Sequence, residues 1–224
     1  MLAPNVNQTG NPHLLLLFAS THSFETMPTY PTGITETILH SRGVGLVAGV
    51  DEAGAGALAG PVVAAAVVLP AGHGLAVRDS KTLSQQQRER LYDQIVAMAI
   101  DWAVALVHVD EIDRSGIRPA NLSAMRRAVE SLKHVDHVLV DAHTVPGLLT
   151  PQTAIIRGDA SEHCIAAASI VAKVTRDRFM TDADTLFPLY QFKQHKGYGT
   201  EAHRRAVVEH GRCPLHRSSF TIVV

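Results

Sequence analysis

Four acidic side chains stand at positions where they could carry out chemistry. Asp51 and Glu52 directly follow the apolar run 44–50, and Asp141 and Asp159 follow two later apolar runs. In each case the backbone would be held in a core sheet while the side chain emerges at the rim. Burying several like charges together is costly unless a cation neutralises them, and hard oxygen ligands suit Mg²⁺ or Mn²⁺. The four acids therefore predict a catalytic site for two divalent ions that activates water against a phosphodiester.

A run of small residues, Ala-Gly-Ala-Gly-Ala, follows the first acidic pair. Gly54 and Gly56 let backbone groups approach a ligand without an intervening Cβ atom. A tight turn into the next strand is the alternative explanation; next to a metal centre we favour close contact with a sugar or a phosphate. Lys81 in DSK and Lys173 in AKVTRD are candidates to neutralise phosphates, and Tyr198 in HKGYGT to stack on a sugar or base. The competing interpretations are a solvated lysine and an aromatic ring packed in a core.

The bulk composition excludes several classes of protein. The chain has 224 residues, enough for one large domain or one domain with a tail, and 46% of them are hydrophobic. The longest apolar runs, 14–19 and 62–69, are far shorter than the roughly 20 residues of a membrane helix. Only two cysteines are present, which argues against a disulfide framework and fits a reducing cytosol. We therefore expect a cytoplasmic protein without a membrane segment.

Basic residues gather near the C-terminus of a chain whose formal net charge is only −1. This basic stripe, residues 193–217, interleaves histidines with cations and is predicted to grip the phosphates of a nucleic acid. Within it, His210, Cys213 and His216 have a spacing that a zinc site could use, but we assign them to the stripe or to the surface. The cations of the stripe are Lys193, Lys196, Arg204, Arg205, Arg212 and Arg217.

Apolar periodicity predicts strands that alternate with helices, which is typical of an α/β protein with a mixed sheet. A capping box at Ser84 predicts the start of one helix, and Ser161 and Thr200 are predicted to precede two later helices. The segment 1–43, rich in Pro, Thr, Asn and Ser, is expected to be a poorly ordered leader before a catalytic domain over 44–224. Strands are predicted over 44–50, 61–70, 102–109, 137–142 and 153–159, and another helix over about 120–133.

The chain resembles the type 2 ribonucleases H, bacterial ribonuclease HII in particular. The matching stretches, in the order of the family, are VAGVDEAGAGALAGPVVAAAVVLP, DSKTLS, EIDRSGI, HVLVDA, IIRGDA, AAASIVAKVTRD, FPLYQFKQHKGYGT and HRSSF. The resemblance implies an RNase H-like α/β fold: a mixed central sheet flanked by helices, with a helical C-terminal segment that binds substrate. It also implies that Asp51, Glu52, Asp141 and Asp159 bind Mg²⁺ or Mn²⁺. Asp177 lies in a matching stretch too, but inside a predicted helix, so we expect it to form a structural ion pair.

The function implied by the resemblance is that of an endonuclease. The family cuts the RNA strand of RNA–DNA hybrids and nicks on the 5′ side of a ribonucleotide embedded in duplex DNA, leaving a 3′-hydroxyl and a 5′-phosphate. It reads the 2′-hydroxyl through backbone groups of a Gly-Arg-Gly turn, with a tyrosine near the junction sugar. Tyr198 matches that tyrosine, but the turn here is Gly54-Ala55-Gly56, without the arginine. The resemblance further implies a monomer, and the sequence shows no clear C-terminal clamp-binding motif.

Two other functions remain open. One is a non-catalytic or weakened RNA–DNA hybrid-binding protein, because Ala55 replaces the arginine that would contact a phosphate; the presence of all four acids argues against loss of catalysis. The other is a dinucleotide-binding oxidoreductase, because GAGALAG follows a predicted strand. Its glycine spacing is G-x-G-x-x-x-G instead of G-x-G-x-x-G, and the next segment, which Pro61 opens, is predicted to be a strand and not a helix.

Overall fold

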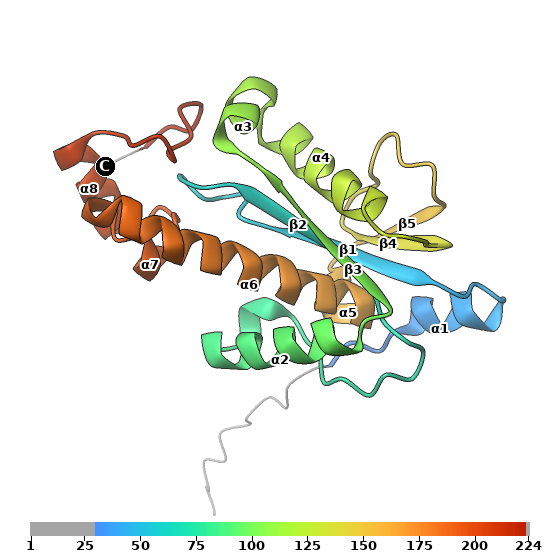
Figure 1. Cartoon of the computed structure of the whole chain (residues 1–224). Helices are drawn as coiled ribbons and strands as arrows, with labels where there is room; N and C mark the ends of the chain where they lie inside the picture. The colour runs from blue at the N-terminus through green and yellow to red at the C-terminus, as the bar shows by residue number, and fades with distance from the viewer. Residues whose placement is uncertain (1–29, 223–224) are drawn as a thin grey trace, which may run out of the picture.

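A five-stranded mixed sheet forms the centre of the protein (Figure 1). The computed structural model describes residues 30–222, and within them the strand order is β3-β2-β1-β4-β5. β1 is parallel to β4, which is parallel to β5, whereas β2 is antiparallel to both β1 and β3. The prediction of an α/β protein with a mixed sheet is confirmed. The strands are β1 (Val47–Ala53), β2 (Val62–Val68), β3 (Asp101–Val107), β4 (His137–Asp141) and β5 (Gln152–Ile155).

Helices cover both faces of this sheet (Figure 1). α4 packs on one face against alternate residues of the strands, and α6 and α2 pack on the other face. Among residues 30–222, no helix has both the length and the apolar character needed to cross a bilayer. The α-helices are α1 (Ile34–Ser41), α2 (Gln85–Met98), α3 (Val109–Ser115), α4 (Ile117–Glu130), α5 (Gly158–Ser161), α6 (His163–Leu186), α7 (Phe192–His195) and α8 (Glu201–His210), with 3₁₀ turns η1 (Ser80–Thr82) and η2 (Pro188–Tyr190).

The long helix α6 lies close against β1 because small residues line both surfaces. Gly49 of β1 has no side chain, and a Cβ atom there would collide with the backbone of Cys164 at the start of α6. The buried alanines at 166–168 extend the contact along α6. This close packing brings Ser169 of α6 beside the carboxylate of Asp51. The surroundings of the first predicted catalytic acid are therefore fixed by helix-to-sheet packing.

The structure differs from expectation at residues 30–43, which belong to the predicted poorly ordered leader but include helix α1. Thr35 donates from its hydroxyl to Glu162 Oε1 at 2.8 Å. Glu36 is buried and accepts a hydrogen bond from the N–H of Cys164 at 2.8 Å. These hydrogen bonds join segments more than a hundred residues apart, which local composition does not reveal. Residues 1–29 of the expected leader lie outside the described residues.

The chain leaves the sheet earlier than predicted before Asp159. The strand predicted over 153–159 stops short of Asp159, which lies in the short helix α5. Arg157 adopts a left-handed conformation with φ of 58°, and the N–H of Gly158 donates to Asp141 Oδ1 at 2.7 Å. The prediction that Asp159 ends a strand is therefore wrong, because the backbone here turns to cap a side chain of β4 instead of extending the ladder.

Helix starts follow the local sequence where a side chain is free to cap. Ser84 and Gln87 form a reciprocal capping box at α2, and Thr200 accepts the N–H of the residue three positions later at α8. Both predictions are confirmed. The prediction for Ser161 is wrong, because Ser161 is the last residue of α5 and Glu162 precedes α6. The carboxylate of Glu162 is turned away toward α1, where Thr35 binds it.

Candidate active site

Asp51 and Glu52 are adjacent in β1, and their side chains point to opposite faces of the sheet. β1 runs through both residues, whereas the sequence predicted that the strand ends before them. Successive side chains of a strand alternate between faces. Asp51 faces α6 and Ser169, while Glu52 faces α4, where Asn121 Nδ2 donates to Glu52 Oε1 at 3.2 Å. The two carboxylates thus reach the end of the strand from its two sides.

Asp141 joins this pair at the end of β4. The register of the parallel strands pairs Val50 with Val140, so Asp51 and Asp141 occupy the next positions along the two strands. Parallel strands bring their carboxyl ends to the same edge of a sheet. The hydrogen bond from the Gly158 N–H to Asp141 then attaches α5, which carries Asp159, to the same edge. The structure therefore brings the four predicted acids to one corner, defined here as the carboxylate corner.

Lys81 supplies a positive charge at the carboxylate corner. Its Nζ donates to Asp159 Oδ2 at 2.7 Å, with 76% of the lysine side chain exposed and 7% of the aspartate side chain exposed. The hydrogen bond to Asp159 raises the pKa of Lys81, and partial burial opposes that effect. The backbone of Lys81 is held by Asp79, whose Oδ1 accepts its N–H at 2.9 Å. Lys81 thus presents an exposed, anchored cation beside the acids.

Burial and mutual repulsion make negative charge costly at the carboxylate corner. Desolvation raises the pKa of Asp51 well above its usual value, and the charges of Glu52 and Asp141 raise it further. Desolvation and then Asp141 raise the pKa of Glu52. Desolvation and then Asp159 raise the pKa of Asp141, and the N–H of Gly158 partly offsets them. Since these carboxylates repel one another, a cation bound among them would lower the free energy of their charged state.

The donor set fits a hard divalent cation, although the side chains are not yet arranged around one. All four candidate ligands are carboxylates, the oxygen donors that Mg²⁺ and Mn²⁺ prefer. Among residues 30–222, however, no three His, Cys, Asp or Glu side chains already converge on a single point where an ion would sit. An ion held by three or more of these acids at once would therefore need their side chains to rotate. The exposed Lys81 is the partner that Asp159 would release.

A cavity of about 500 Å³ opens beside the carboxylate corner. Glu52 and Asp141 line it together with Ala55 and Gly56 of the following turn. Helix α4 forms the opposite wall, with Asn121 near Glu52. The turn and two of the acids therefore face a common space that a ligand can enter.

Of the two glycines in the turn, Gly54 has a backbone conformation that favours glycine, whereas Gly56 does not and has open space where a Cβ atom would lie. Gly54 has φ of 97°, and a Cβ atom there would collide with the side chain of Arg176. Among the described residues, none accepts a hydrogen bond from the N–H groups of Ala55 or Gly56. The turn leads into β2, which is antiparallel to β1. The dinucleotide-binding alternative needs a helix at this point and is excluded.

Lys173 and Tyr198 lie together, near Asp177 and Arg176. Lys173 Nζ is 5.2 Å from the centroid of the Tyr198 ring and donates to Asp177 Oδ1 at 2.7 Å. The predicted ion pair of Asp177 is confirmed by this contact. The guanidinium of Arg176 is 5.1 Å from the same ring centroid. Tyr198 is thus a half-buried ring among cations, and neither Lys173 nor Tyr198 forms a hydrogen bond or ion pair with the four acids in the part of the chain described.

The basic stripe 193–217 is not the uniform phosphate-binding surface that the sequence predicts. Arg217 is fully buried. Arg212 donates to the backbone carbonyl of Arg217 and to those of two later residues, and Arg205 pairs with Glu201. These arginines hold the C-terminal segment together. A pattern of charges along the sequence cannot show whether an arginine has this internal role or is exposed to a ligand.

His216 is buried as well, so the assignment of this residue to the surface is wrong. Its Nε2 lies 3.0 Å from Nε2 of His203, and its Nδ1 accepts the N–H of Cys213 at 2.9 Å. His203 Nδ1 in turn lies 2.9 Å from the carbonyl oxygen of Tyr198. The histidines therefore form an internal network behind the tyrosine.

Sequence reasoning missed Asn121 and Arg176, which have contacts at the site, and assigned Arg217 to the phosphate-binding stripe instead. Asn121 holds Glu52, and its Oδ1 is buried without a hydrogen-bond partner in the described residues. Arg176 and Arg217 are both fully buried and bind backbone carbonyls around the turn after β1. Arg176 and Arg217 lie in the matching stretches AKVTRD and HRSSF. Their place in these family motifs was the only sign in the sequence that they have a specific role. Their burial was not visible, because charged residues are mostly exposed.

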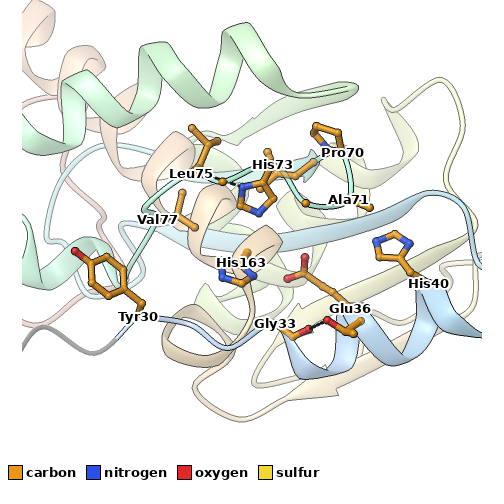
Figure 2. A pocket seen from close by; sticks show the side chains of 14 residues that line it. Tyr30, Gly33, Glu36, His40, Pro70, Ala71, His73, Leu75, Val77 and His163 are labelled. Carbon is orange, nitrogen blue, oxygen red and sulfur yellow. Dashed lines mark hydrogen bonds between the residues drawn. The ribbon is translucent and has the colours of Figure 1, made fainter.

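A larger cavity, of about 640 Å³, lies where β1 begins and β2 ends (Figure 2). Helix α1, the segment 69–77 and His163 surround it. The rings of His73 and His163 meet edge to face with centroids 5.2 Å apart. None of the four acids lines this cavity, so it is separate from the candidate active site.

Solved structures share this fold. The ribonuclease H2 from Pyrococcus horikoshii OT3 matches with a TM-score of 0.67 and 28% sequence identity, over 78% of this chain and 93% of that chain. The structure of the PCNA:RNase HII complex from Archaeoglobus fulgidus contains a chain that matches with a TM-score of 0.69 and 25% identity, over 80% of this chain and 96% of that chain. The mixed sheet, its helices and the acids at its edge define a hydrolase with the RNase H-like fold.

The family is shown by sequence as well as by fold. A family model described as ribonuclease HII matches residues 48–223, and the chain belongs to the ribonuclease HII family, the type 2 ribonucleases H. It is 49% identical over 193 residues to a ribonuclease HII from Saccharopolyspora erythraea, covering 84% of this chain and 85% of that protein. It is 48% identical over 187 residues to a ribonuclease HII from Caldicellulosiruptor saccharolyticus, covering 83% and 91%. The resemblance inferred from the motifs is confirmed.

Proposed function

We propose that this protein is an endoribonuclease that hydrolyses the RNA strand of RNA–DNA hybrids and nicks on the 5′ side of ribonucleotides embedded in duplex DNA. The products would carry a 3′-hydroxyl and a 5′-phosphate. The observation that carries the proposal is the gathering of Asp51, Glu52, Asp141 and Asp159 at one corner of the sheet, in a chain of the ribonuclease HII family. The four acids at this corner repel a polyanion, so bound cations would be needed before a nucleic acid approaches them.

The four acids would hold two divalent ions, Mg²⁺ or Mn²⁺. When bound, such ions supply a hydroxide nucleophile at neutral pH and stabilise the departing oxygen. The protein orients the ligands: Ser169 contacts Asp51, Asn121 donates to Glu52, and the N–H of Gly158 donates to Asp141. Lys81 binds Asp159 while no ion is present, and once released by Asp159 it would offer its charge to a substrate phosphate.

Recognition of the ribonucleotide would fall to the turn after β1 and to Tyr198. Ala55 and Gly56 line the same cavity as Glu52 and Asp141, and their N–H groups find no acceptor among the described residues. A 2′-hydroxyl both donates and accepts hydrogen bonds and is the group that distinguishes RNA from DNA. Tyr198, half-buried beside Lys173, offers a ring on which a sugar can pack.

A cleavage assay tests this function directly. The full chain is incubated with Mg²⁺ or Mn²⁺ and either an RNA–DNA hybrid or a DNA duplex that contains one ribonucleotide, with an all-DNA duplex as control. We expect cuts in the first two substrates only, with a 3′-hydroxyl at the nick, and no cuts when the ions are chelated. Cutting of the all-DNA duplex, or no cutting of either ribonucleotide substrate, would contradict the proposal.

A non-catalytic or weakened hybrid-binding protein is the second candidate, and Ala55 is the observation that favours it. The arginine of the family turn is absent, so one charge-assisted contact to a phosphate is lost, on the order of 1.5–3 kcal/mol if nothing compensates. Such a protein would bind a hybrid in a mobility-shift experiment yet leave it intact at saturating Mg²⁺ or Mn²⁺. Cutting at a reduced rate would identify the weakened enzyme instead.

The proposed working form is a monomer. The Archaeoglobus fulgidus relative is described in a complex with PCNA, and the present sequence shows no clear C-terminal clamp-binding motif. Size-exclusion chromatography with light scattering would test the monomer. A role in the removal of ribonucleotides from DNA, in the cytoplasm, remains a prediction.

A further inference from the structure

We propose that Arg217 and Arg176 are positioning residues of the turn after β1, acting from inside the protein. Their buried guanidiniums draw the carbonyl groups of the segment 54–61 inward, which leaves the N–H groups of Ala55 and Gly56 for the substrate. This inference rests on the proposed function. The two arginines do not contact the substrate themselves; they position the backbone groups that recognise the ribonucleotide.

Arg217 binds the start of the segment 54–61 and a residue near its end at the same time. Its Nη2 donates to the carbonyl oxygen of Gly54 at 2.7 Å and to that of Gly60 at 2.9 Å. Its Nη1 donates to the carbonyl oxygen of Ala55 at 2.8 Å, and its Nε to that of Gly60 at 3.1 Å. A planar guanidinium with a fixed fork of donors sets the relative position of these carbonyls, which a lysine cannot do.

Arg176 connects the second half of the loop to the segment that carries Tyr198. Its Nε donates to the carbonyl oxygen of Pro61 at 3.0 Å and its Nη2 to that of Ala59 at 3.0 Å. Its Nη1 donates to the carbonyl oxygen of Lys196 at 2.9 Å. Since its guanidinium also lies 5.1 Å from the centroid of the Tyr198 ring, one side chain connects the loop that follows the turn to the proposed sugar-packing ring.

The two arginines place positive charge behind the turn, with Asp113 and Asp177 as the nearby negative groups. Both are fully buried, and neither forms an ion pair with a carboxylate within residues 30–222. Burial lowers the pKa of Arg217 to about 10, with the nearby Arg176 adding to the effect, so the group stays protonated at neutral pH. Neutral carbonyls satisfy the N–H donors without cancelling the charge. The turn is therefore backed by a positive field that favours an anionic backbone in front of it.

Asp113 explains how Arg217 is kept in place. Its carboxylate accepts hydrogen bonds from the backbone N–H and hydroxyl groups of Ser218 and Ser219, at distances from 2.6 to 3.0 Å. These bonds lower the pKa of Asp113 to about 2. The residues after Arg217 are thereby attached to helix α3, so the arginine enters the loop from a fixed direction.

The test compares Arg217→Lys with Arg205→Lys. Arg205 is the control, because it lies in the same C-terminal stretch but is exposed and pairs with Glu201, away from Arg217 and the turn. Both changes are made in the Asp141→Asn background, which prevents cutting. Affinity is measured by fluorescence anisotropy for a duplex with one ribonucleotide and for the same duplex in all-DNA form.

We expect Arg217→Lys to lower the ratio of the two affinities by about tenfold, since hydrogen bonds that fix the turn are lost. Arg205→Lys should leave the ratio unchanged. A loss of folded protein alone reduces both affinities equally and does not move the ratio. An unchanged ratio in folded Arg217→Lys overturns the inference. Failure of the proposed function looks different, because the unmodified protein then cuts neither ribonucleotide substrate.

A measurement without any change at the arginines covers the case in which Arg217→Lys does not fold. Amide hydrogen exchange is followed for Ala55 and Gly56 in the Asp141→Asn protein, with and without each duplex. We expect both amides to exchange rapidly in the free protein and to be protected by the ribonucleotide duplex but not by the all-DNA duplex. Slow exchange in the free protein, or equal protection by the two duplexes, overturns the inference.

Discussion

Lys81 and Asp159 form an ion pair of 2.7 Å at the carboxylate corner, with the lysine side chain largely exposed and the aspartate buried. The lysine can bind the buried acid or a substrate phosphate, and it can move from the acid to the phosphate when substrate arrives. Because 76% of the lysine side chain remains in solvent, its charge is also within reach of a substrate phosphate.

Replacing Lys81 should reveal whether it contacts a phosphate. We expect Lys81→Ala to weaken binding of a ribonucleotide duplex and to reduce the slope of log K against log salt by about 0.9, the value for one phosphate contact. The measurement is a salt titration of affinity, with Lys193→Ala from the exposed part of the basic stripe as a comparison. A weaker affinity with an unchanged slope would show that Lys81 acts only on Asp159.

Asp141→Asn should abolish nicking while the fold persists. The asparagine Oδ1 can still accept the Gly158 N–H that Asp141 accepts at 2.7 Å, so α5 stays attached. The loss of one negative charge among the ligands should reduce the rate by roughly 100-fold or more. The control is Asp136→Asn. Asp136 directly precedes the first residue of β4, and its carboxylate accepts the N–H of Leu46. Substantial nicking by Asp141→Asn would remove this residue from the catalytic set.

Asn121→Ala should lower activity through Glu52. The amide of Asn121 is the side-chain donor that orients Glu52, at 3.2 Å, and loss of such a supporting partner typically costs about 10–100-fold in activity or metal affinity. We expect a rate decrease of about tenfold at saturating Mg²⁺. Ser123→Ala, on the same helix, serves as the control, because Ser123 donates to Glu111 and not to Glu52. Equal rates for the two variants would exclude a positioning role for Asn121.

Ala55→Arg should restore a contact that the family turn has and this chain lacks. The Arg217 side chain donates to the backbone carbonyl of Ala55. A change of the side chain at position 55 therefore leaves that hydrogen bond intact. A guanidinium at this position can bind a phosphate in charge-assisted fashion, and we expect affinity for a single-ribonucleotide duplex to rise by about tenfold. Ala55→Met adds similar length without charge and should not change affinity. If Ala55→Arg leaves both binding and cleavage untouched, another residue already fills the role.

The histidine network behind Tyr198 should make stability depend on pH. Burial lowers the pKa of His203 from 6.5 to about 4, with the charges of His195 and His216 adding to the effect. The unfolded chain therefore binds the proton more tightly than the folded protein does. The stability that neutral His203 contributes is complete above about pH 6.5 and is lost as the pH falls from there through about 4.

Urea unfolding at about pH 8 and about pH 4 measures this effect, which we expect to be roughly 3 kcal/mol of unfolding free energy. His203→Gln keeps an amide near the Tyr198 carbonyl but does not titrate in this range. The difference between the two proteins isolates His203 from the acids, whose raised pKa values act in the opposite direction. Parallel pH dependence in both proteins would show that His203 is not the responsible group.

The sequence alone determined which residues could do the chemistry. Acids that follow apolar runs are placed at strand ends by periodicity, so the pattern of residue types was enough to assign Asp51 and Asp141 to one sheet edge. The capping box at Ser84 and the cap at Thr200 followed from local hydrogen bonding, because a helix cap involves residues only three positions apart. The matching motifs added the family, which the fold and the comparisons then confirmed.

Tertiary structure decided the rest. Asp159 reaches the carboxylate corner from a short helix and not from a strand, because the Gly158 N–H caps Asp141. Arg217 looked like a surface cation but binds carbonyls about 160 positions earlier in the chain. Helix α1 is held by Glu162, which lies 127 positions after Thr35 in the sequence. Burial and long-range hydrogen bonds depend on which segments meet in space, and no local pattern of residue types encodes that meeting.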